Sequence, residues 1–171
     1  MKNLIPLCLL ALSFGSGPAN AAVVNFSFDG TVAASNGAPF GLNVGDTIGA
    51  VGRFDDAALS GTGQEAISLI DLTLSVGSAR FGPGDVQPGM PLALIFSDGV
   101  FAGLDYSSNT NLSDAFDSNN LVFSGSDSFW NNFDGSWNVA SFQVTAVPVP
   151  AAVWLFGSGL LGVAGLVRRR V

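Results

Sequence analysis

An uncharged run of 18 residues, at positions 150–167, constrains this chain more than any other feature. As an α-helix the run would be about 27 Å long, close to the hydrocarbon thickness of a bilayer. Pro148 and Pro150 precede the apolar part, and proline favours an extended approach and then the first turn of a helix. A basic stop follows, made of Arg168, Arg169 and Arg170, and arginine holds that end of a membrane helix in the cytoplasm. We therefore expect a single transmembrane helix over residues 150–167 rather than a buried core helix.

Residues 1–21 have the layout of a secretory signal peptide. Lys2 supplies a positive charge, an apolar stretch follows over residues 4–14, and Ala19 and Ala21 form a small-x-small cleavage site. A retained N-terminal anchor is the alternative, but the apolar stretch is too short to span a bilayer well. Because Lys2 and the arginine tail both prefer the cytoplasmic side, we expect residues 22–146 to be exported across the inner membrane.

The exported part is strongly acidic. It contains all 13 acidic residues of the chain, and its only basic residues are Arg53 and Arg80, which gives a net charge of −11. A surface of this sign excludes nucleic acid and anionic lipid as partners, because both need a basic footprint. An anionic polysaccharide would also be repelled unless divalent cations bridged it.

Histidine is absent from the sequence, and the single cysteine, Cys8, lies in the predicted signal peptide. Ser-His-Asp and Cys-His mechanisms are therefore excluded, and a zinc site is not expected. Carboxylates remain as the only catalytic groups, but Asp55 and Asp56 are adjacent and point to opposite faces if extended, and Glu65 is the sole glutamate. We expect a protein without enzymatic activity.

Alternating apolar residues predict β-strands in the exported part, where no helical period is sustained. The clearest strand covers residues 68–76, with four apolar side chains on one face: Ile70, Leu72, Leu74 and Val76. Residues 92–96 and 100–106 flank Asp98-Gly99, a pair that favours a two-residue hairpin turn. We predict an all-β fold, a single antiparallel β-sandwich-like domain of about seven or eight strands rather than a closed sheet.

Several other segments are predicted from their composition. Asp29-Gly30 should end the first strand, and Asp134-Gly135 should form another turn. Residues 107–120, rich in Ser, Asn and Asp, are predicted to be a polar loop. Short strands are predicted at residues 121–123 and 129–130, and a last strand over residues 137–146.

Residues 147–170, VPVPAAVWLFGSGLLGVAGLVRRR, combine a proline motif, an apolar helix and an arginine cluster in that order. This tail resembles the PEP-CTERM sorting signal of Gram-negative bacteria. The family's Pro-Glu-Pro reads Pro148-Val149-Pro150 here, within the motif Val147-Pro148-Val149-Pro150, so the glutamate is missing. The resemblance implies an exosortase as the partner, cleavage near the proline motif, and delivery to the cell surface or extracellular matrix, where exopolysaccharide is made.

We therefore expect an exported, non-enzymatic surface or matrix protein linked to exopolysaccharide and biofilm. The alternative is a carbohydrate-binding or calcium-dependent module that uses the same sorting route. Calcium needs only oxygen ligands, and the candidates are Asp114, Asp117, Asp127 and Asp134. The competing interpretation is that these aspartates are solvated turn residues. The segment that contains Asp114 and Asp117 and the one that contains Asp127 and Asp134 both lack the spacing of a known calcium loop. Trp130, Trp137 and Tyr106 could stack on sugar rings, but we expect them to fill the core because they flank or lie within predicted strands.

Overall fold

The computed structural model describes residues 23–110 and 114–147. The predicted signal peptide, the proline motif from Pro148 onward, the transmembrane helix and the arginine tail lie outside the described residues. Within the part that is described, no helix has the length and hydrophobicity needed to cross a bilayer.

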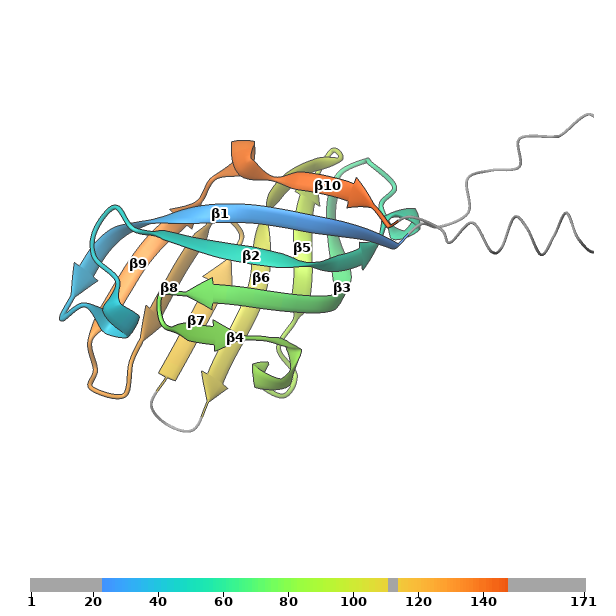
Figure 1. The fold of residues 1–171 in the computed structure, drawn as a ribbon. Helices are drawn as coiled ribbons and strands as arrows, with labels where there is room; N and C mark the ends of the chain where they lie inside the picture. Colours follow the sequence, from blue (N-terminus) through green and yellow to red (C-terminus); the bar gives the residue numbers. More distant parts are fainter. Residues whose placement is uncertain (1–22, 111–113, 148–171) are drawn as a thin grey trace, which may run out of the picture.

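Ten strands and four short 3-10 helices make up the described chain (Figure 1). The strands are β1 (Val23–Asn36), β2 (Thr47–Asp55), β3 (Gln64–Val76), β4 (Ala79–Phe81), β5 (Leu92–Ser97), β6 (Val100–Thr110), β7 (Asp114–Asn119), β8 (Val122–Ser126), β9 (Asn132–Trp137) and β10 (Gln143–Ala146). The 3-10 helices are η1 (Pro39–Gly41), η2 (Asp56–Ala58), η3 (Pro83–Asp85) and η4 (Val139–Ser141).

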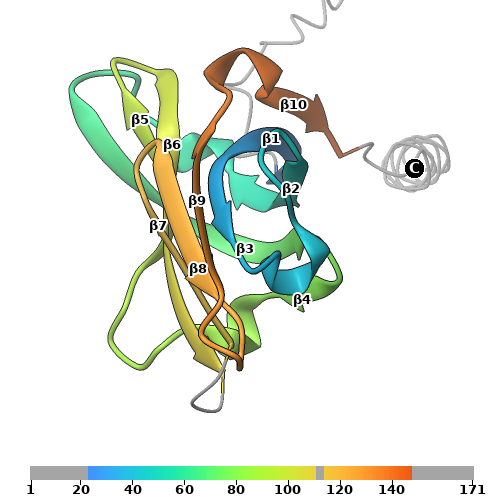
Figure 2. The same ribbon diagram turned by 90° about the vertical axis from the view of Figure 1, so that its left-hand side faces the viewer.

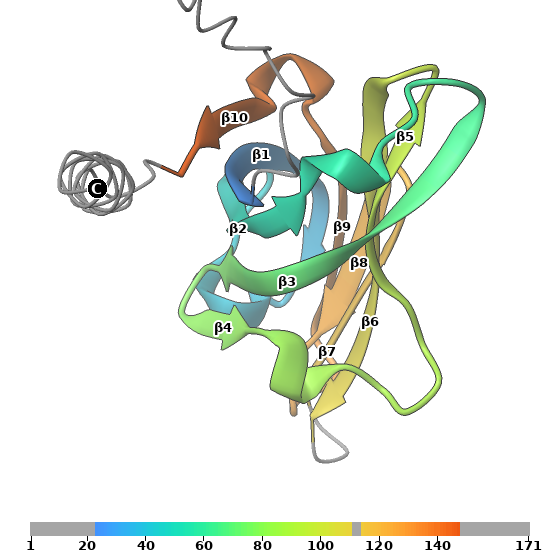
Figure 3. The same cartoon turned by 90° about the vertical axis from the view of Figure 1, so that its right-hand side faces the viewer.

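The strands form one antiparallel sheet in the order β10-β1-β2-β3-β5-β6-β7-β8-β9, with β4 paired to β3. β1 also pairs with β9, so the sheet closes on itself. The two longest strands, β1 and β3, form the corners, meaning the places where the sheet folds over and passes from one layer to the other. β1 pairs with β10 in its first half and with β9 in its second, whereas β3 pairs with β5 in its first half and with β2 and β4 in its second. Figures 2 and 3 show the result as two facing layers, with β1 to β4 and β10 on one side and β5 to β9 on the other.

The prediction of an antiparallel all-β domain is confirmed. The predicted sandwich-like arrangement of seven or eight strands needs two corrections. The sheet has ten strands, and the two layers are joined at both corners as parts of one closed sheet. The physical reason is strand length: β1 has 14 residues and β3 has 13, so each strand serves both layers. Register shifts occur between Val32 and Ala34 of β1 and between Arg53 and Phe54 of β2, and bulges of this kind bend strands.

Two of the predicted Asp-Gly turns are wrong. Asp29-Gly30 lies inside β1, and Asp134-Gly135 lies inside β9. Both glycines leave room for one aromatic ring: a Cβ on Gly30 would lie 2.5 Å from Phe123 Cε1, and a Cβ on Gly135 would lie 2.4 Å from Phe123 Cζ. Asp98-Gly99 does form the predicted hairpin turn, with φ angles of 50° and 77° at its two residues.

The polar loop predicted at residues 107–120 is also wrong, since β6 extends to Thr110 and β7 begins at Asp114. Three buried serines in these strands all form hydrogen bonds: Ser107, Ser108 and Ser118. The Ser118 hydroxyl accepts a hydrogen bond from Trp137 Nε1 at 2.8 Å and donates one to the Leu104 carbonyl at 2.9 Å. Serine can lie in a strand interior when its hydroxyl is satisfied in this way.

The remaining strand predictions hold in part. Leu72, Leu74 and Val76 of β3 are buried as expected, but Ile70 is 49% exposed. The register shift in the β2–β3 pairing leaves Ile70 without a partner and turns it outward. Residues 129–130 lie in the β8–β9 loop and not in a strand, and residues 137–146 are divided between β9, η4 and β10.

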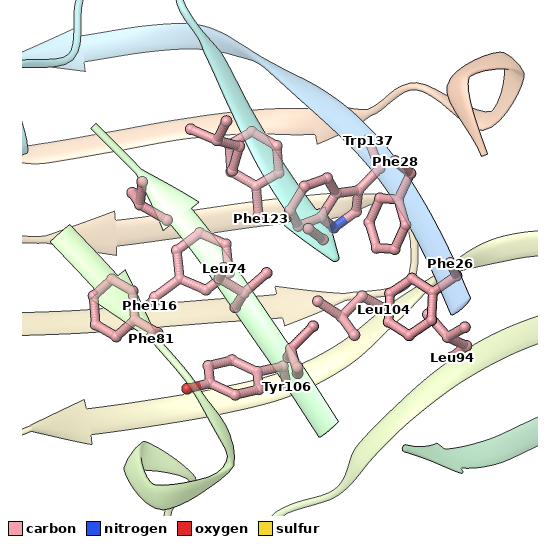
Figure 4. Close-up of a cluster of buried hydrophobic side chains, with 14 of the residues drawn as sticks. Phe26, Phe28, Leu74, Phe81, Leu94, Leu104, Tyr106, Phe116, Phe123 and Trp137 are labelled. Atoms are coloured by element: carbon pink, nitrogen blue, oxygen red, sulfur yellow. The ribbon is translucent and has the colours of Figure 1, made fainter. Parts of the chain in front are cut away.

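Aromatic rings and aliphatic side chains together fill the space between the two layers (Figure 4). The ring of Phe28 is central, with its centroid 4.7 Å from that of Phe101 and 4.8 Å from that of Trp137. Tyr106 is also buried, and its hydroxyl donates a hydrogen bond to the Gly82 carbonyl at 3.0 Å. This bond satisfies the polar end of the ring and attaches the β4–β5 connection to β6.

Tyr106 is the only tyrosine in the sequence, and burial raises its pKa to about 12. A raised folded-state pKa stabilises the fold fully below the unfolded-state value of about 10, and this contribution is lost as the pH rises beyond it. We expect tyrosinate absorbance in the folded protein to titrate at about 12. In denaturant the midpoint should fall to about 10. The Tyr106→Phe variant controls for other absorbance changes, and a midpoint that is the same with and without denaturant would contradict the prediction.

Candidate functional site

The structure brings the four calcium candidates together in two pairs and not at one point. Asp117 on β7 and Asp134 on β9 both pair with Ser124 on β8 and line a hollow of about 300 Å³ on the outer face of these strands. Two strand spacings separate them, so their Cα atoms are about 10 Å apart. Asp114 begins β7 and Asp127 begins the β8–β9 loop, and the two lie near each other because Ala115 pairs with Ser126. Among the described residues there is no group of three or more His, Cys, Asp or Glu side chains that could hold a metal ion.

A larger hollow, of about 490 Å³, lies on the outer face of β10, β1, β2 and β3. Strand pairing arranges its lining in two rows: Thr145, Asn25, Arg53 and Asp71, and then Gln143, Ser27, Val51 and Thr73. Arg53 and Asp71 form an ion pair, with Nη2 and Oδ2 separated by 2.6 Å, and both side chains are partly exposed. Apart from the apolar side chain of Val51, the other side chains of the two rows are amides and hydroxyls. This surface can form hydrogen bonds, but its one cation is already paired with a carboxylate.

The most distinctive surface feature is the loop of residues 127–131 between β8 and β9, which we name the aromatic loop. Its two aromatic side chains point into solvent, with Phe129 82% and Trp130 84% exposed. By contrast, Tyr106 and Trp137 are buried in the core as expected. The expectation of core filling is therefore wrong for Trp130 alone.

Asp127 organises the aromatic loop. Its carboxylate accepts hydrogen bonds from the Phe129 amide at 2.9 Å, from the Asn131 amide at 3.1 Å, and from Asn131 Nδ2 at 2.9 Å. The backbone closes the turn, because the Trp130 amide donates to the Asp127 carbonyl and the Asp127 amide donates to the Asn131 carbonyl, each at 3.0 Å. The Asn131 side chain lowers the pKa of Asp127, with the backbone amides contributing. We call the three hydrogen bonds to Asp127 the clamp. At neutral pH the carboxylate that accepts them is therefore charged.

The aromatic loop lies at one end of the domain. Asn132, which follows the loop, pairs with Asn36 at the C-terminal end of β1, whereas Ala146 pairs with Val24 at the N-terminal end of β1. Figure 1 shows the β8–β9 loop at the opposite end from the point where β10 ends. A sequence signal for this loop exists in retrospect, because an Asp that accepts hydrogen bonds from amides a few residues later is a common turn element.

Comparison with family models, with curated proteins and with solved structures gives no match.

Proposed function

We propose that this chain is an exported, non-enzymatic protein of the cell surface or extracellular matrix, linked to exopolysaccharide. In this proposal residues 1–21 direct export, residues 150–167 hold the β-domain at the inner membrane, and an exosortase then processes the chain near Val147-Pro148-Val149-Pro150. The observation that carries the proposal is the order of proline motif, apolar run and arginine cluster in residues 147–170.

The arrangement of the domain is compatible with attachment at one end. The first described residue, Val23, and the last strand residue, Ala146, lie at the same end of β1, because Val24 pairs with Ala146. Val147 then follows β10 directly. A tether at the C-terminus would leave the rest of the domain, including the aromatic loop, extending away from the membrane (Figure 1).

A change of both prolines in the motif tests the sorting proposal. Pro148→Ala combined with Pro150→Ala is expected to leave an unprocessed, membrane-held form, because the extended entry to the helix is lost. The measurement is the mass of the protein and its distribution between membrane and medium in cells that contain an exosortase. The matched control is Pro88→Ala combined with Pro91→Ala, which changes two exposed prolines in the β4–β5 connection. Processing of the Pro148/Pro150 variant at the wild-type rate would reject the motif.

The second candidate function is a carbohydrate-binding module on the same sorting route. One specific observation favours it, namely the exposure of Phe129 and Trp130 on a loop that is held in place by hydrogen bonds.

A further inference from the structure

We infer that the aromatic loop, residues 127–131, is a binding site for an uncharged polysaccharide. Phe129 and Trp130 stack on the apolar faces of sugar rings, and the amides and hydroxyls beside them bond to the sugar hydroxyls. The inference deepens the proposed function and rests on it in one respect only, namely that the domain is exported to where the polysaccharide lies. Binding by the loop itself is independent of the sorting signal.

The exposure of the two rings is unusual for this domain. The other aromatic side chains described between residues 23 and 147 are buried in the core or pack partly buried against it. Phe129 and Trp130 stand more than four-fifths exposed and are adjacent in the chain. Removing rings of this size from water on binding would be strongly favourable.

The loop holds the rings outward by specific bonds. The three hydrogen bonds to the Asp127 carboxylate and the two backbone bonds of the turn fix the path from residue 127 to residue 131. Trp130 has a φ angle of 64°, a left-handed conformation that is unfavourable for residues with a Cβ. The backbone conformation that presents the indole therefore exists before any ligand arrives, which lowers the entropy cost of binding.

The chemistry around the rings favours an uncharged ligand. Asp127 is the loop's only ionised group, and its oxygens already accept three hydrogen bonds from within the loop. The polar residues next to these positions in the chain are neutral: Ser126, Ser128, Asn131 and Asn132. Asp114 of β7 adds a second acid near Asp127, because Ala115 pairs with Ser126, and no basic residue lies in this segment. The exported part has a net charge of −11, so polyanions are repelled. Flat rings flanked by amides and hydroxyls match the alternation of apolar faces and hydroxyl edges in a neutral sugar polymer.

The position of the loop argues against the membrane as the occupant. The pairs Val24–Ala146 and Asn36–Asn132 mark the two ends of β1, and 12 residue steps of strand correspond to about 40 Å along the chain. In the proposed function the tether leaves the domain at the first of these ends. The aromatic loop then faces the space outside the membrane, where a matrix polymer would lie.

The test uses the full chain, purified in a zwitterionic detergent that carries no sugar headgroup, in native gels containing a polymer. The probes are hydroxyethylcellulose and dextran as uncharged polymers, and polygalacturonate as an anionic one. We expect at least one uncharged polymer to retard the protein and polygalacturonate not to. Trp130→Ala and Phe129→Ala should each weaken the retardation by about tenfold, and the double variant by about a hundredfold. Asp127→Ala should weaken it with both rings still present, because the clamp is lost.

Val100→Ala is the matched control, since Val100 is exposed but lies in the β5–β6 hairpin, and it should bind like the wild type. Thermal unfolding of each variant separates loss of binding from loss of fold. The inference is overturned if neither uncharged polymer retards the protein, or if the ring variants are retarded as strongly as the wild type. It is equally overturned if the rings are needed instead for binding phosphatidylcholine vesicles or for self-association. Trp130→Ala should be processed normally in cells, so a sorting failure and a binding failure remain distinguishable.

Discussion

Replacing Gly103 by alanine is expected to lower the free energy of unfolding by about 4 kcal/mol, through overpacking and backbone strain together. Gly103 has a φ angle of 132°, and a Cβ there would lie 2.0 Å from the backbone carbon and oxygen of Asn120. The β7–β8 turn folds closely over β6 at this point, because the Leu104 amide donates a hydrogen bond to the Asn120 carbonyl at 3.0 Å. An added methyl group forces the turn away from β6 and weakens that bond.

Gly84→Ala is the matched control for this variant. A Cβ on Gly84 meets no atom within 4 Å, and its φ angle is not in the left-handed region. Both changes remove the same conformational freedom from the unfolded chain, so this contribution cancels in the comparison. Urea unfolding should show a large fall in the midpoint for Gly103→Ala and a change within about 0.5 kcal/mol for Gly84→Ala. Equal midpoints for the two variants would show that the turn does not pack against Gly103.

The sequence predicted the fold class because strand alternation is a local signal. It predicted the Asp98-Gly99 turn correctly and the Asp29-Gly30 and Asp134-Gly135 turns wrongly, although the three dipeptides are identical. The difference is long-range: Gly30 and Gly135 are required by the ring of Phe123, which packs against both. A local pattern cannot distinguish a glycine that permits a positive φ from a glycine that makes room for a distant ring.

The sequence does not predict that the sheet closes, because closure also depends on a long-range contact. The β1–β9 pairing joins residues about a hundred positions apart, and no local feature of either strand specifies the partner. The buried serines of β6 and β7 make that region look like a loop, because a serine is satisfied inside a sheet only once its strands are paired. Ser107 and Ser108 bond to residues of β7, and Ser118 bonds to Leu104 and Trp137.

The sequence indicates Asp127 and Trp130 of the candidate site but not Phe129, and it does not predict the geometry of the loop. Trp130 and Trp137 are each followed by an asparagine, yet Trp130 is 84% exposed and Trp137 is 4% exposed. The sequence offers Asp127 as a calcium ligand, whereas in the structure its oxygens accept hydrogen bonds from the amides of its own loop. The sequence shows that a carboxylate is present, but the turn that uses it depends on the register of β8 with β9.

This pair of tryptophans gives the second large prediction. Trp137→Ala is expected to lower the free energy of unfolding by about 4 kcal/mol, a large part of a typical total of about 5–15 kcal/mol. The centroid of the Trp137 indole lies 4.8 Å from the ring centroid of Phe28 and 4.8 Å from that of Phe123. Its Nε1 donates to the Ser118 hydroxyl at 2.8 Å, and its backbone pairs with Gly30 where the sheet closes. The variant leaves a cavity at the closure and removes the donor that bonds to a buried hydroxyl.

Trp130→Ala is the control, because it removes the same side chain from a position where the ring packs against little of the domain. Its free energy of unfolding should change by no more than about 0.5 kcal/mol. In urea, Trp137→Ala should lower the midpoint with an unchanged slope, as expected for a cavity that leaves the native surface intact. If the two alanine variants unfold at the same urea concentration, Trp137 does not hold β9 against β1. We expect Trp137→Ala to lose stability and Trp130→Ala to lose only polymer binding. This pair of results would assign closure of the sheet to Trp137 and ligand binding to Trp130.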